Sequence, residues 1–132
     1  MAQLIRSRFD LDQLTADRRR ALQDMREEAE GLAAALRSLG AQEVYLFGSV
    51  AKEDARMEVW PDGTLINDAD LDLLAVMDTD LPVFRRAPWL LSGLYEQGII
   101  PRYPVDLVVY TPSEFTQQDS LVRTVLHEGV KL

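Results

Sequence analysis

The sequence contains no cysteine and a single histidine, His127. The lack of cysteine excludes disulfide bridges and metal sites built on thiolates, and it is compatible with a cytoplasmic location. We expect His127 to lie at the surface or at a helix end rather than to act in catalysis. No apolar run approaches the roughly 20 residues of a membrane-spanning helix. The first residues mix charges too early for a signal peptide, so we expect none and no membrane association.

Positive charge is also scarce, because 14 lysine and arginine residues stand against 22 aspartate and glutamate residues, for a net charge of −8. A chain this acidic repels phosphate backbones, so we expect no general nucleic-acid binding. The one basic run, Arg18 to Arg20, is typical of a solvated helix face. A contact for an acidic partner is the alternative.

The length of 132 residues and an apolar content of 47% suit one domain, 1–132, with one core. Residues 15–39 are predicted to form a helix with Thr15 as N-cap and Gly40 just past its end. The prediction rests on one apolar stripe spaced by threes and fours: Leu22, Met25, Ala29, Leu32, Leu36 and Leu39.

Four further segments predict strands. Residues 44–47, 71–77 and 105–110 are short apolar runs. The segment 56–67 has turn residues between β-favouring flanks and predicts a hairpin.

Two more helices are expected, after Pro82 and at about 114–127, with Pro88 kinking or breaking the first of them. The resulting order is helix, strand, hairpin, strand, helix, strand, helix. This order predicts an α+β fold in which helices flank a small mixed sheet.

Aspartates are concentrated where the second apolar strand begins, at Asp68, Asp70 and Asp72. If the strand has begun by residue 70, Asp70 and Asp72 point to the same face. Like charges this close are unfavourable unless a positive group lies between them, and Mg²⁺ prefers such oxygen ligands. The alternative is that these are turn and edge residues solvated by water.

Asp106 repeats this pattern at the start of the next apolar strand. If that strand lies beside the strand of Asp70 and Asp72, three acids meet and can hold divalent ions for a phosphoryl-type transfer. Asp106 can also accept the proton of an attacking hydroxyl. Gly48 and Ser49, directly after the first strand, can present backbone N–H groups to a phosphate.

Together the segments "YLFGSVAK", "ADLDLLAVMD" and "PVDLVVYTPSEF" resemble the minimal nucleotidyltransferases of the DNA-polymerase-β-like superfamily. The resemblance covers about 43–115, which we expect to be the catalytic core. It implies the nucleotidyltransferase fold, with the 56–67 hairpin as an insertion. It also implies Mg²⁺-dependent transfer of AMP from ATP to a hydroxyl, with release of pyrophosphate.

The resemblance also implies a role for each matched residue. Asp70, Asp72 and Asp106 correspond to the catalytic, metal-binding carboxylates. Gly48 and Ser49 correspond to the pair that grips phosphate, with Lys52 in place of the arginine that often follows it. Asp68 lies outside the motif and is expected in a loop.

Minimal members of this family often act as antitoxins by adding AMP to a HEPN-type toxin, so the expected partner is such a protein. Two alternatives stay open. One is a binding module, weakened or inactive in catalysis, that neutralises a partner by contact; Ala69, where the family commonly has serine, favours it. The other is a nucleotidyltransferase acting on a small molecule, as antibiotic-modifying relatives do.

Overall fold

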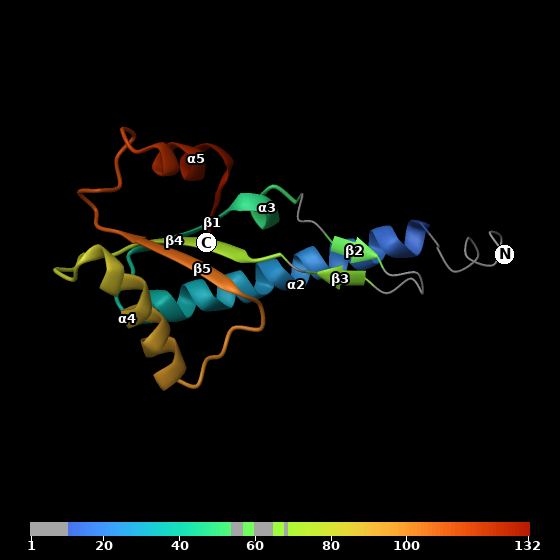
Figure 1. The fold of residues 1–132 in the computed structure, drawn as a ribbon, viewed down its shortest axis with the longest axis horizontal. Helices are drawn as coiled ribbons and strands as arrows, with labels where there is room; N and C mark the ends of the chain where they lie inside the picture. Colours follow the sequence, from blue (N-terminus) through green and yellow to red (C-terminus); the bar gives the residue numbers. More distant parts are fainter. Residues whose placement is uncertain (1–10, 54–56, 60–64, 68) are drawn as a thin grey trace.

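Strand β1 (Glu43–Phe47) lies between two partners and organises the sheet. It pairs antiparallel with β4 (Leu71–Val76) on one side and with β6 (Val130–Lys131) on the other. Strand β5 (Val105–Tyr110) runs parallel to β4, so the sheet is mixed, with the order β5-β4-β1-β6 (Figure 1). The computed structural model describes residues 11–53, 57–59, 65–67 and 69–132. The expected α+β architecture with a small mixed sheet is confirmed.

Helix α2 (Leu11–Ser38) packs its apolar stripe on one face of the sheet. Helix α2 begins at Leu11, so the prediction of Thr15 as N-cap is wrong: residues 11–14 contain no helix breaker and continue the helix. Gly40 has φ +117°, a conformation that favours glycine at a helix end. The stripe is buried as predicted, with Leu39 partly buried: Leu22, Met25, Ala29, Leu32 and Leu36.

Strands β2 (Met57–Val59) and β3 (Leu65–Asn67) form a separate antiparallel pair, which confirms the hairpin. Its predicted turn residues lie outside the described residues.

Helix α4 (Val83–Glu96) covers the same face of the sheet as α2 (Figure 1). Pro88 lies inside α4, so the predicted break does not occur. A proline removes the hydrogen bond to the carbonyl four residues earlier, here that of Phe84. Both residues are exposed, so water can hydrate that carbonyl.

Helix α5 (Ser120–Glu128) lies on the opposite face of the sheet, above β1 (Figure 1). The prediction of a helix from residue 114 is wrong, because 114–119 form an irregular segment of turns and bends before the helix. Asp119 is the N-cap, and its carboxylate accepts a 3.0 Å hydrogen bond from the backbone N–H of Val122. The two-residue strand β6 was not predicted. None of the helices in the described part of the chain is long and apolar enough to span a bilayer.

Candidate active site

Asp72 and Asp106 are direct partners in the β4–β5 register. Neighbouring strands lie about 4.8 Å apart, and side chains at partnered positions share a face. Both carboxylates therefore lie on one face, at the end of the sheet where β4 and β5 begin. It is the face of Leu74 and Val76, which pack with residues of α5 rather than with α2 and α4. The expected meeting of these two acids from neighbouring strands is confirmed.

Asp70 joins them from outside the sheet. Strand β4 begins at Leu71, so Asp70 precedes the strand and is exposed to solvent. The condition on which Asp70 and Asp72 were expected to share a strand face, a strand that has begun by residue 70, is not met. Asp68 lies outside the described residues.

The pKa of the half-buried Asp72 carboxyl is affected by both other acids. Burial raises its pKa above the ordinary value, and the charges of Asp106 and Asp70 raise it further. No cation is among the causes of this shift. The three acids are near enough to interact, and ionisation of Asp72 is less favourable than in a free aspartate.

The backbone of Gly48 lies against the carboxylate of Asp72. It follows β1 directly, at φ +74°, and opens the four-residue helix α3 (Gly48–Ala51). A Cβ atom added at Gly48 would lie 2.1 Å from Oδ2 of Asp72, which is too close for any side chain. Both the backbone conformation and the contact require glycine here. The sequence pattern predicted a bend at this position, and the structure shows that the bend meets Asp72.

Two arginines of α2 hold the far end of this bend. Arg26 donates a 3.1 Å hydrogen bond to the carbonyl of Ala51, and Arg18 donates a 3.2 Å hydrogen bond to the carbonyl of Glu53. Glu53 has φ 59°, which is uncommon for a residue with a side chain. Arg18, from the basic run, is thus engaged with its own chain. These contacts fix the turn that carries Gly48 and Ser49.

Ser49 and Lys52 occupy opposite ends of α3. Ser49 is half-buried in its first turn. Lys52 follows the last turn, and its Nζ lies 3.8 Å from a carboxylate oxygen of Glu128 in α5. A phosphate that contacts Lys52 would therefore have to compete with Glu128.

The oxygen ligands of these acids suit a hard divalent ion. The charges at Asp70 and Asp106 raise the pKa of Asp72, and a bound cation would offset this repulsion. In residues 11–53, 57–59, 65–67 and 69–132, however, no three His, Cys, Asp or Glu side chains form a ready-made ligand group. Mg²⁺ usually takes one or two carboxylates and completes its coordination with water and phosphate. The residues fit a site of that open kind.

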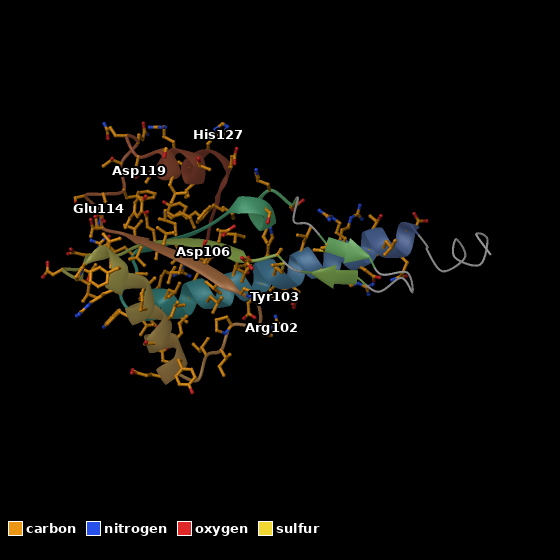
Figure 2. The ribbon with its side chains drawn as sticks, in the orientation of Figure 1. Arg102, Tyr103, Asp106, Glu114, Asp119 and His127 are labelled. Carbon is orange, nitrogen blue, oxygen red and sulfur yellow. The ribbon has the colours of Figure 1, made fainter. Side chains whose placement is uncertain are left out.

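The loop before β5 is tied to α2. Arg102 donates a 2.8 Å hydrogen bond to Glu28 and a 3.0 Å hydrogen bond to Asp24, and the Tyr103 hydroxyl bonds the same Asp24. This bond is the first cause of the lowered pKa of Asp24. Figure 2 shows Arg102 and Tyr103 below Asp106. Both residues thus fix the start of β5 against α2.

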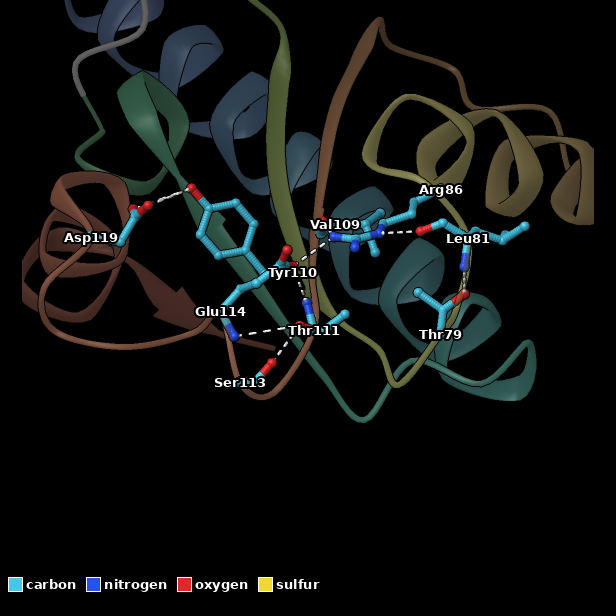
Figure 3. Close-up of polar contacts among 9 residues, drawn as sticks. All are labelled: Thr79, Leu81, Arg86, Val109, Tyr110, Thr111, Ser113, Glu114 and Asp119. Atoms are coloured by element: carbon cyan, nitrogen blue, oxygen red, sulfur yellow. Dashed lines mark hydrogen bonds and ion pairs between the residues drawn. The ribbon is translucent and has the colours of Figure 1, made fainter.

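A second polar cluster lies at the other end of β5 (Figure 3). Arg86 is buried and bonds the carbonyls of Leu81 and Val109 and the carboxylate of Glu114, the last at 2.6 Å. Nearby, the Tyr110 hydroxyl bonds Asp119. Both residues border, with Arg86 and Glu114, a pocket of about 440 Å³. These polar groups satisfy one another, so we assign the cluster to stability.

Sequence reasoning missed Arg86, because nothing in a helix pattern marks one arginine as buried. His127 is exposed in the last turn of α5, as expected (Figure 2).

No protein-family model matches the chain, and no curated protein sequence matches it at the significance required. The function is therefore argued from the geometry of the site and from the motif resemblance.

Proposed function

We propose that the chain is a Mg²⁺-dependent nucleotidyltransferase with a polymerase-β-like fold that transfers AMP from ATP to a hydroxyl. One observation carries the proposal: the Gly48 backbone packs on the carboxylate of Asp72, whose register partner is Asp106. A phosphate-gripping bend and two strand-borne acids thus meet at one point, with Asp70 beside them. The sequence motifs alone do not contain this contact.

In the proposed reaction the acceptor hydroxyl attacks the α-phosphorus of ATP. The bond from that phosphorus to the α–β bridging oxygen breaks, and pyrophosphate leaves with the oxygen. Asp106, the most exposed of the strand-borne acids, takes the hydroxyl proton. Mg²⁺ held by Asp70, Asp72 and Asp106 would offset the charge of the triphosphate and the leaving group.

The backbone and hydroxyl of Ser49, with the N–H of Gly48, are proposed to hold the phosphates after the α-phosphate. Positioning by these groups would supply much of the rate. Lys52 would add a point charge after exchanging Glu128 for phosphate.

The proposed acceptor is a hydroxyl of a partner protein, a HEPN-type toxin, which makes this chain its antitoxin. The motif resemblance supports this choice. Transfer to a small molecule is the alternative acceptor. An adenylated partner would gain, per site, the mass of AMP less one water.

The test uses ATP labelled on the α-phosphate or on the γ-phosphate, with Mg²⁺ and the co-purified partner. Label from the α-position alone is expected to enter the partner, because AMP rather than phosphate is transferred. The double variant Asp70→Ala/Asp72→Ala should abolish labelling. Its control is Asp78→Ala/Asp80→Ala, which removes a D-x-D pair that is exposed past the other end of β4. Equal labelling by both double variants would contradict the proposal.

A second candidate is a binding module that neutralises its partner by contact. Ala69, at the position where the family commonly has serine, favours it. Co-expression with the toxin separates the two: rescue of growth that survives Asp70→Ala/Asp72→Ala indicates contact, and rescue that is lost indicates catalysis.

A further inference from the structure

Helix α4 presents large apolar side chains to solvent on the side away from the sheet. Phe84 is 74% exposed and Tyr95 is 73% exposed. Pro88 is exposed and Leu91 is half-buried between them. The spacings of four, three and four residues place all of these side chains in one row along the helix axis. We call Phe84, Pro88, Leu91 and Tyr95 the α4 stripe.

Most of the α4 stripe lies outside the protein's own core, and of its four members Leu91 alone also packs against the core. The core side of α4 is formed by Arg86, Leu90 and Leu94, which are all buried. Single exposed apolar residues are ordinary on a surface, but a continuous row with two aromatic members is typical of an interface.

Opposite charges flank the two ends of the α4 stripe. Arg85 and Glu96 are eleven residues apart, close to three full turns, so both lie on the same flank of the stripe. Arg85 stacks near its neighbour, with its guanidinium carbon 5.8 Å from the centre of the Phe84 ring. Within the described part of the chain, Glu96 makes no ion pair or hydrogen bond.

We propose that the α4 stripe is a homodimer interface in which α4 packs antiparallel on α4 of a second copy about a twofold axis. In this arrangement Phe84 faces Tyr95 of the second copy, and Pro88 faces Leu91 of the second copy. Arg85 lies beside Glu96 of the second copy, and the twofold axis makes that ion pair twice. Because the helices are antiparallel, the charged flank of one copy and the charged flank of the other lie on the same side of the interface.

A second copy matches this surface because the stripe is complementary to itself. One flank of the stripe has a positive residue at one end and a negative residue at the other. When a second, identical helix packs antiparallel, each of these charges faces its opposite, as an isologous interface requires. A specific interface usually buries more than about 1,000 Å² in total, and a contact of one helix face from each copy lies at this low end. The dimer is therefore expected to dissociate in the micromolar range.

The test is sedimentation of the full chain over about 1 to 300 µM, which brackets a micromolar dissociation constant. Arg85→Glu and Glu96→Arg should each weaken the dimer at least about tenfold, because each places like charges together at both pairs. The double variant Arg85→Glu/Glu96→Arg should restore it, because it exchanges the charges without losing the pairs. The matched controls Arg19→Glu and Glu30→Arg make the same charge changes on exposed positions of α2 and should leave the mass unchanged.

Restoration by the double variant is specific to a second copy packed antiparallel. A monomer at every concentration overturns the proposal. A dimer that ignores Arg85→Glu, or that the double variant fails to restore, also overturns it. Circular dichroism of each variant establishes that a lost dimer is not a lost fold. The readout is mass alone, so the outcome does not depend on whether the chain transfers AMP.

Discussion

The carboxylate of Asp72 fills the space that a side chain at position 48 would need. Gly48→Ala is therefore expected to lower the free energy of unfolding by about 2–4 kcal/mol, combining left-handed backbone strain with overpacking. Urea denaturation measures this loss. Activity should fall as well, because Asp72 has to move.

The control for backbone strain is Gly98→Ala. Gly98 has φ +76°, close to the value at Gly48, but nothing lies within 4 Å of a Cβ added there. Its cost should be only about 1–2 kcal/mol.

In an Asp72→Ala background the nearest atom of residue 72 is Cβ at 3.4 Å, so Gly48→Ala should cost less than in the wild type. Equal costs in both backgrounds would show that the contact does not matter.

Asp72→Asn is expected to stabilise the metal-free protein at pH 7 by on the order of 1 kcal/mol, the scale of interactions among partly exposed charges. The folded pKa of Asp72 lies above the ordinary 3.8, so protonation of Asp72 stabilises the folded state. This stabilisation is fully present below pH 3.8. It is lost as the pH rises through the folded pKa. The gain from Asp72→Asn should therefore vanish near pH 3. Thermal denaturation at both pH values checks this, and exposed Asp78→Asn should show no such gain.

Mg²⁺ is expected to raise the Tm of the wild type, because an ion that binds only the folded chain stabilises it by mass action. The rise should be larger when ATP is present and should be lost in Asp70→Asn/Asp72→Asn. The D-x-D control Asp78→Asn/Asp80→Asn should keep it. An equal rise in both double variants would place the ion elsewhere.

Glu114→Gln is expected to cost about 1–2 kcal/mol at pH 7, because it removes the charged partner of buried Arg86. The hydrogen bond with Arg86 is the first cause that lowers the pKa of Glu114 below 4.5. The stability it provides is thus present above that pH and is lost as the pH falls through the folded pKa. Urea denaturation should show a smaller difference at pH 3 than at pH 7. Exposed Glu30→Gln on α2 should change neither value by more than about 0.5 kcal/mol.

The parts of the fold that the sequence predicts are those with a strong local signal, which is a periodic stripe, a continuous apolar run or a turn between β-favouring flanks. The stripe from Leu22 to Leu36 and the runs at 71–77 and 105–110 each repeat long enough to define an element. Helix α5 was misplaced because the signal at Asp119, a single N-cap, was weaker than the polar pattern before it. Strand β6 has two residues and no period, so only its pairing with β1 defines it.

The candidate site was predictable in its residue types and only partly in its geometry. Asp72 and Asp106 could be placed on the first residues of two strands, but their direct register follows from pairing that sequence does not contain. The contact between Gly48 and Asp72 depends on the antiparallel register of β1 with β4, in which Phe47 partners Asp72. The proximity of residues far apart in sequence is set by the sheet, and it is there that the structure adds most.

Each border of the four-stranded sheet has a feature that hinders the addition of a strand. On one border Arg86 occupies the outward carbonyl of Val109, and on the other β6 offers only two residues. A short or obstructed edge is a poor template for adding a strand from another molecule. Strand addition from a second molecule is thereby hindered at the Val109 end of β5 and along β6.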